Sequence, residues 1–169
     1  MKKALLIIAK NIFRDEEYLL PRTALENSGI KTITASSTIG VATGKLGLKV
    51  KPDLLVSQVN AADYDAILFI GGAGCSEYFN DPIAHRIAQD TVKLGKILGA
   101  VCAAPEILAR AGVLRGKKAT MYADTGILAQ FGATYTGKGV EIDGNVITAS
   151  GPSTSKEWGE AVATALAQP

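Results

Sequence analysis

The sequence predicts an α/β protein, a three-layer αβα sandwich with a mostly parallel sheet, folded as one domain over residues 1–169. The first observation is four short runs that are continuously apolar or β-branched, at residues 4–9, 31–36, 65–72 and 96–102. Runs of this length are typical of buried strands and are too short for helices. The second observation is that helical patterns separate the runs. Such alternation builds βαβ units with helices on both faces of the sheet.

The predicted helices have recognisable ends. Asp81 is the expected N-cap of a helix that begins at Pro82 and ends at Gly95. A second helix lies within residues 104–112, and the last one opens with a capping box from Thr154 to Glu157. Two segments, residues 40–59 and 133–150, instead show alternation punctuated by glycine. They predict hairpins at the margin of the sheet.

Composition excludes several classes of protein. The net charge is only +2 and is spread along the chain, so no nucleic-acid surface is expected. No apolar run approaches the roughly 20 residues of a membrane span, which predicts a soluble, cytoplasmic protein without membrane contact. Two cysteines, Cys75 and Cys102, are too few for a disulfide scaffold. One histidine, His85, offers no metal-ligand spacing, so no metal site is expected.

Cys102 lies in the stretch KILGAVCAAPEILARAG, where a buried strand passes directly into a helix. Active sites of open α/β sheets lie beyond the carboxyl ends of the strands, which is where Cys102 is expected. Ala100 and Ala104 on either side leave room for the sharp turn of a nucleophile elbow. The following helix start would stabilise a thiolate, and the Ala103 N–H would help to hold an oxyanion. The alternative is a small buried hydrophobic residue, as most free cysteines are.

A pair of glycines adds to this pattern. Residues 65–72 end in Gly71 and Gly72, where backbone N–H groups can approach a ligand without an intervening side chain. If this strand adjoins the Cys102 strand, Gly72 supplies a second oxyanion donor. The alternative is an ordinary turn at the end of a strand.

Acidic residues crowd the start of the first helix. Asp15, Glu16 and Glu17 follow one another there, and a solvated acidic first turn is the ordinary explanation. The alternative is that one of the three points into the crevice as a carboxylate beside Cys102.

Together these motifs resemble the ThiJ/PfpI superfamily over nearly the whole chain. The matching stretches are the acidic helix ending in YLLP, GKLGLKVKPD, DYDAILFIGG, GAVCAAPEILARAGVLRGKKAT and VEIDGNVITASGPSTS. The resemblance implies a flavodoxin-like sheet, a homodimer and no cofactor. It also implies that Cys102 is the reactive nucleophile and that Glu17 is a protonated glutamate bonded to it. Gly72 and Ala103 match the oxyanion-hole backbone positions.

The elbow departs from part of this family. The protease-like and bacterial deglycase branches read CHGP, whereas this chain reads CAAP, and Ala103 cannot take a proton. His85 is expected on a solvated helix surface, away from the chemistry. CAAP is closer to the CAGP of the parkinsonism-associated branch, which has a histidine in the region that reads KATMY here. Tyr122 in that region is either a hydrogen-bond donor to substrate or an ordinary packed tyrosine. The family also has an arginine before GP near the C-terminus, and this chain lacks it, since it reads TASGPSTS.

The leading hypothesis is a cofactor-free glyoxalase or deglycase-like enzyme. An aldehyde has no leaving group that a histidine must protonate, so a Cys102–Glu17 pair suits a small carbonyl substrate such as methylglyoxal. Thiolate attack would give a hemithioacetal, after which Glu17 would move the proton from the neighbouring carbon and water would release lactate.

Two alternatives remain open. The first is a sensor of oxidative stress, in which a low-pKa Cys102 thiolate is oxidised and Cys75 serves as a resolving thiol. The second is an amidase or peptidase, by family analogy, with Glu77 or His85 reaching the site from a neighbouring subunit.

Overall fold

The computed structural model describes residues 1–169 and confirms the predicted fold class. Its main sheet has seven strands in the order β11-β12-β8-β7-β1-β3-β6. Their bounds are β1 Lys3–Ile8, β3 Lys31–Ser36, β6 Leu54–Leu55, β7 Ala66–Phe69, β8 Ile97–Val101, β11 Val140–Asp143 and β12 Val146–Ala149. Every neighbouring pair is parallel except β11 with β12, so the sheet is mostly parallel with one marginal hairpin.

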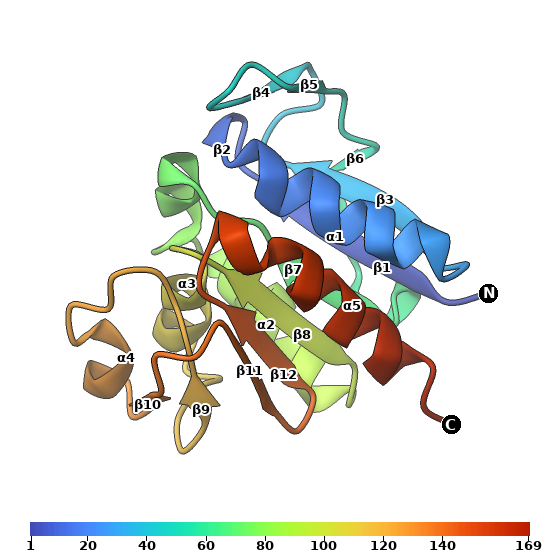
Figure 1. Ribbon diagram of the computed structural model, residues 1–169. Coiled ribbons are helices and arrows are strands. Elements are labelled where there is room, and N and C mark those ends of the chain that lie inside the picture. Colours follow the sequence, from blue (N-terminus) through green and yellow to red (C-terminus); the bar gives the residue numbers. More distant parts are fainter.

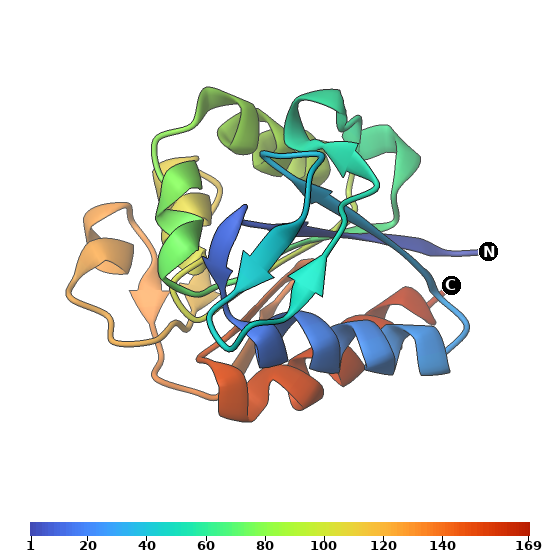
Figure 2. The ribbon, with the colours of Figure 1, turned by 90° about the horizontal axis from the view of Figure 1, so that it is seen from above.

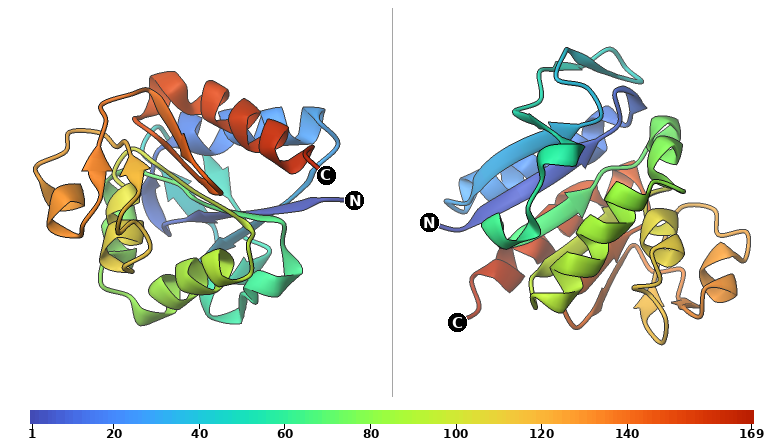
Figure 3. Two further views of the ribbon diagram at one scale, coloured as in Figure 1. Left: turned by 90° about the horizontal axis from the view of Figure 1, so that it is seen from below. Right: turned by 180° about the vertical axis from the view of Figure 1, so that it is seen from behind.

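Helices cover both faces of this sheet (Figures 1 and 2). Helices α1 Asp15–Asn27 and α5 Ser155–Leu166 lie side by side on one face. Helices α2 Pro82–Lys93 and α3 Pro105–Arg110 lie on the other, as the views from below and behind show (Figure 3). The short helix α4 Ile127–Gln130 stands at the side of the molecule. Side chains alternate between the faces of each strand, so two apolar cores form, one under each pair of helices.

Close packing joins α1 to α5 and to the sheet. Pro21 lies inside α1 without a backbone N–H to donate, and it packs against Gly159 of α5. A Cβ atom on Gly159 would lie 2.5 Å from the Pro21 Cα atom, so the two helices can approach this closely only at a glycine. Trp158 is fully buried, and its Nε1–H donates to the Ile147 carbonyl of β12 at 2.9 Å.

Both hairpin predictions are confirmed, with one difference in placement. β4 Ala42–Gly44 and β5 Lys49–Val50 pair as a hairpin, but they join β2 Asn11–Phe13 in a separate three-stranded sheet. β11 and β12 form the other hairpin at the margin of the main sheet. The residues before it form β10 Thr134–Tyr135, which pairs with β9 Lys118–Ala119.

Of the two predicted helix N-caps, the structure confirms one and contradicts the other. The Asp81 side chain accepts a hydrogen bond from the Ile83 N–H at 3.0 Å, so this N-cap is confirmed. The capping box at Thr154 is wrong, because that hydroxyl turns back to the Gly151 backbone and leaves the helix N–H groups of α5 uncapped. No helix in the structure combines the length and the apolar character required to cross a lipid bilayer.

Candidate active site

The turn from β8 into α3 holds Cys102 in a conformation that few side chains adopt. Cys102 has a φ of 62°, in the left-handed region that costs a non-glycine residue conformational energy. Its N–H donates to the Ala149 carbonyl at 2.9 Å, and its carbonyl accepts from the Tyr122 N–H at 2.9 Å. Ala100 and Ala104 are fully buried on either side. The sharp strand-to-helix turn predicted from the sequence is therefore present, and it leaves Cys102 partly exposed.

Three adjacent strands bring the other candidate residues to Cys102. β8, β7 and β1 are neighbours in the sheet and run parallel, so the segments that follow them meet at one edge. The glycine pair follows β7, as the oxyanion-donor hypothesis requires. The first turn of α1, which carries Glu17, follows β1 and β2.

Glu17 lies behind Cys102 and is fully buried. The position of Gly71 shows how tightly the two side chains meet. A Cβ atom there would lie 2.5 Å from Glu17 Oε1 and 2.8 Å from Cys102 Cβ. Neither Glu17 carboxyl oxygen makes a hydrogen bond of good geometry. The Cys102 thiol is nevertheless close enough to this carboxyl for each group to shift the pKa of the other. Glu17 is thus the acidic residue that points into the crevice.

The backbone N–H groups of Gly72 and Ala103 point at the Cys102 sulfur and act to lower the pKa of its thiol. Neither N–H donates to another backbone carbonyl. Gly72 has a φ of 101°, and a Cβ atom there would lie 2.5 Å from the Arg14 nitrogen. Conformation and space therefore both require glycine at this donor. The two N–H groups form a cradle for negative charge on sulfur or on an oxygen bonded next to it.

Burial dominates the titration of the pair. It raises the pKa of Glu17 to about 7, against smaller opposing effects of the thiol and of Arg14. Burial and the Glu17 charge raise the pKa of Cys102 to about 12. The expectation of a depressed thiol pKa is therefore wrong, because burial and the adjacent carboxyl together outweigh the N–H groups. The two acids titrate as a coupled pair that loses its first proton near neutral pH.

Cys75 and Glu77 lie in the 3-10 helix η3 Ala73–Tyr78, directly after the glycine pair. Cys75 is fully buried in the core under α2 and α3, and burial raises the pKa of its thiol far above the ordinary value. Both cysteines are free thiols. Glu77 is exposed and accepts a hydrogen bond from the Lys10 N–H at 2.9 Å. The structure thus gives Cys75 a packing role and Glu77 a loop contact.

His85 and Tyr122 also have defined places. A ring nitrogen of His85 is bonded to the Phe79 carbonyl at 2.7 Å, so this half-buried histidine ties α2 to the preceding loop. Tyr122 touches the elbow through its backbone, while its side chain is 63% exposed. Its ring is not an ordinary packed tyrosine, and it is free to meet a ligand.

Arg14 is a site neighbour that sequence reasoning missed, whereas Asp15 was one of the three candidate carboxylates and turns to a different contact. Asp15 is buried, and its carboxylate accepts from the N–H groups of Leu46 and Leu48 at 3.0 and 2.9 Å, which fixes the β4–β5 turn. Arg14 donates its backbone N–H to the Gly71 carbonyl at 3.0 Å. The available signal is an arginine directly before three acidic residues, a spacing that favours a local ion pair.

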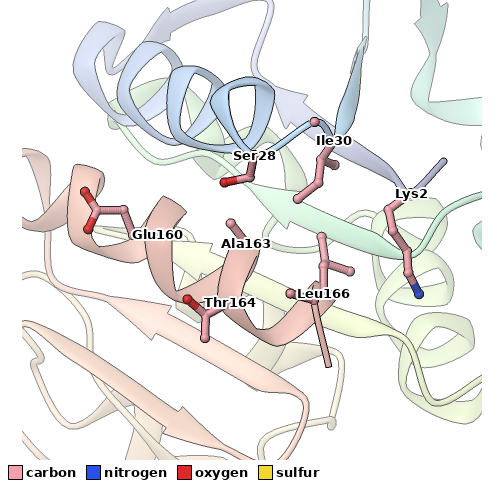
Figure 4. Close-up of a pocket in the computed structure, with 9 residues that line it drawn as sticks. Lys2, Ser28, Ile30, Glu160, Ala163, Thr164 and Leu166 are labelled. Atoms are coloured by element: carbon pink, nitrogen blue, oxygen red, sulfur yellow. The ribbon is translucent and has the colours of Figure 1, made fainter. Parts of the chain in front are cut away.

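One surface hollow of about 310 Å³ lies between the C-terminal ends of α1 and α5 (Figure 4). Lys2, Ser28, Glu160 and Thr164 are among its lining residues. Lys2 precedes β1, so the hollow is at the amino ends of the strands, opposite the Cys102 edge, and neither cysteine lines it. Nowhere in the structure do three or more metal-ligating acidic, histidine or cysteine side chains cluster.

A nucleophile elbow, a buried glutamate and two N–H donors at the carboxyl edge of an αβα sandwich fit the resemblance drawn from the sequence. The model of the DJ-1/PfpI family matches residues 2–165. The chain belongs to the DJ-1/PfpI family. A ThiJ/PfpI domain protein from Brachyspira murdochii superimposes with a TM-score of 0.94 at 33% sequence identity, covering 97% of this chain and 95% of that one.

Several relatives are similar to this chain over most of its length. Uncharacterized protein MJ0967 of Methanocaldococcus jannaschii is 40% identical over 97% of this chain and 82% of its own length. Deglycase PfpI of Pyrococcus furiosus is 33% identical over 91% of this chain and 93% of its own length. Glutathione-independent glyoxalase DJR-1.2 of Caenorhabditis elegans is 26% identical over 99% and 90%, respectively.

Proposed function

We propose that the protein is a cofactor-free, cysteine-dependent glyoxalase or deglycase-like enzyme that acts on small 2-oxoaldehydes or their adducts. The observation that carries the proposal is a buried Glu17 carboxyl against the Cys102 thiol, with the N–H groups of Gly72 and Ala103 aimed at the sulfur. Relatives named as a deglycase and a glyoxalase support the same class of substrate.

The first step forms a bond between the Cys102 sulfur and the aldehyde carbon of the substrate. With one proton on the pair, the raised pKa of the thiol keeps that proton on Cys102 and leaves Glu17 as the carboxylate. Glu17 takes the proton as the sulfur attacks, so the negative charge develops under the two N–H groups. Attack moves the charge onto the carbonyl oxygen, which the Gly72 and Ala103 N–H groups stabilise. Glu17 then protonates this oxygen and gives a neutral hemithioacetal.

The second step is a proton transfer within the hemithioacetal. The Glu17 carboxylate removes the proton from the carbon bonded to sulfur, and the neighbouring carbonyl oxygen takes up the electron pair as an enediolate. Glu17 returns this proton to the neighbouring carbon, and the hydroxyl proton of the sulfur-bound carbon moves to the neighbouring oxygen, which gives a thioester on Cys102. Water then cleaves the carbon–sulfur bond. For methylglyoxal the sum is addition of one water to give lactate, with no net oxidation. A Glu17 pKa of about 7 suits a group that alternates between acid and base.

Peptide hydrolysis is less well supported. An amine leaving group requires a proton donor, commonly a histidine, and the single histidine of this chain is bonded to the Phe79 carbonyl. The geometry favours a substrate that has no leaving group to protonate.

The test is lactate production from methylglyoxal, measured for the wild type, Cys102→Ser and Glu17→Gln. We expect turnover by the wild type and losses of at least 100-fold in both variants. Cys75→Ala is the matched control, because it removes the buried thiol and leaves the elbow intact. Absence of lactate from the wild type, with the Cys102 thiol shown to be reduced, would overturn the proposal.

A second candidate is a peroxide-responsive protein without turnover. It is favoured by the partial exposure of Cys102 and by an adjacent carboxyl that would donate a hydrogen bond to a cysteine sulfinate. Disulfide formation with Cys75 is not part of this candidate, because that thiol is buried and its pKa is raised. A stable mass increase of two oxygen atoms on Cys102, without lactate formation, would favour it. A homodimer is likewise proposed from the family resemblance, and light scattering in solution tests it.

A further inference from the structure

We infer that the substrate of this site carries a carboxylate, and that Arg14 binds it beside Cys102. The inference rests on the proposed function and narrows its substrate class. It selects adducts of 2-oxoaldehydes with carriers that hold a free carboxylate, such as amino acids or small thiol acids.

The backbone of Arg14 lies against the oxyanion donors. Its N–H donates to the Gly71 carbonyl at 3.0 Å, and a Cβ atom on Gly72 would lie 2.5 Å from the same nitrogen. Arg14 also stands at the N-terminal boundary of α1, three residues before Glu17. The Arg14 side chain therefore extends from a backbone segment that lies beside the oxyanion donors.

The guanidinium is held in place before any ligand arrives. Its Nε and Nη2 atoms donate to the two carboxylate oxygens of Glu16 at 2.9 and 3.0 Å. This ion pair lowers the pKa of Glu16 and keeps that carboxylate ionised. A planar guanidinium has five N–H donors, and the Nη1 edge makes no hydrogen bond within the protein. The free edge matches the two oxygens of a second carboxylate.

The Arg14 side chain is accessible to a ligand in part. It is 28% exposed, so most of it is packed while the remainder reaches solvent. Arg22 of the same helix offers a contrast. It pairs with Glu26 at 2.7 Å, but its guanidinium lies over the Tyr18 ring and donates to the Tyr18 hydroxyl. Arg22 therefore serves as a control for Arg14, because its guanidinium already contacts Glu26 and Tyr18.

The first experiment compares two hemithioacetals of methylglyoxal, one with N-acetylcysteine and one with N-acetylcysteamine. They differ by one carboxylate. We expect the wild type to favour the N-acetylcysteine adduct by about tenfold or more in kcat/KM, as for other charge-assisted bidentate contacts. Arg14→Met should bring the ratio close to one, Arg14→Lys should give an intermediate ratio, and Arg22→Met should keep the wild-type ratio. Equal use of both adducts by the wild type, or a ratio unchanged in Arg14→Met, overturns the inference and leaves the proposed function standing.

The second experiment reads binding without turnover. Isothermal titration of N-acetyl-S-methylcysteine and of N-acetyl-S-methylcysteamine into Cys102→Ser separates the two proposals if no adduct is consumed, because these unreactive carriers differ by one carboxylate. Tighter binding of N-acetyl-S-methylcysteine that is lost when Arg14→Met is added supports the carboxylate site even where the proposed function fails. Equal affinity for the two carriers overturns the site.

Discussion

Replacing Glu17 with glutamine tests the titration of the buried carboxyl. Burial raises the pKa of Glu17 from 4.5 to about 7 in the folded protein. Each pKa unit corresponds to about 1.4 kcal/mol, so the ionised form is disfavoured by about 3 kcal/mol on folding. Between pH 4.5 and 7 the unfolded chain releases this proton while the folded chain keeps it. The free energy of unfolding therefore falls as the pH rises through this window, and it levels off above pH 7.

Glutamine cannot ionise, so the variant lacks this pH dependence. We expect its stability, relative to the wild type, to increase by about 2–3 kcal/mol between pH 5 and pH 8. The assay is urea denaturation at both pH values, followed by the fluorescence of Trp158, which is the single tryptophan and is fully buried.

The matched control is Glu16→Gln, one residue away on the same helix. Arg14 lowers the pKa of Glu16, so this carboxyl stabilises the fold above its unfolded pKa and loses that effect only as the pH falls. Its difference from the wild type should stay constant between pH 5 and pH 8. If the Glu17→Gln difference is also the same at both pH values, the carboxyl is not desolvated and the reasoning about the site is refuted.

Three further predictions concern the backbone around the site. Gly71→Ala would crowd the Glu17 carboxyl and the Cys102 side chain, and we expect the free energy of unfolding to fall by about 2–4 kcal/mol. Gly151→Ala is the control, because a Cβ atom there meets open space, and equal urea midpoints for the two variants would contradict this. Cys102→Gly should be about 1 kcal/mol more stable than Cys102→Ala, because φ is 62° there, and a more stable alanine variant would show that the elbow is unstrained. Asp15→Ala should expose the amides of the β4–β5 turn to hydrogen exchange while β8 stays protected, and unchanged exchange in the turn would show that the carboxylate does not hold it.

The fold could be predicted from the sequence because its main signals are local. The strands that flank the site are short apolar runs, and burial on both faces explains why they show no alternation. The elbow could be predicted for the same reason, because the small residues Ala100 and Ala104 indicate a turn without room for larger side chains.

The remainder of the site depends on contacts between distant segments. Asp15, Glu16 and Glu17 are consecutive, and each points to a different neighbour, because successive residues turn by about 100° around a helix. Composition cannot tell which one faces the thiol, and only the family resemblance singled out Glu17. The raised pKa of Cys102 arises from burial and from that carboxyl, which comes from another part of the chain. The contact between the Arg14 N–H and the Gly71 carbonyl likewise joins two distant segments.

The two thiols of this chain differ in what must happen before a reagent can reach them. Cys102 is partly exposed in the native state, whereas Cys75 is enclosed in the core under α2 and α3. An alkylating agent therefore meets the first in the intact protein and the second only when that core opens. The two thiols therefore report on two different events: labelling of Cys102 reports the state of the elbow, and labelling of Cys75 reports how often the core opens. The ratio of their labelling rates would measure folding integrity in the same sample in which activity is assayed.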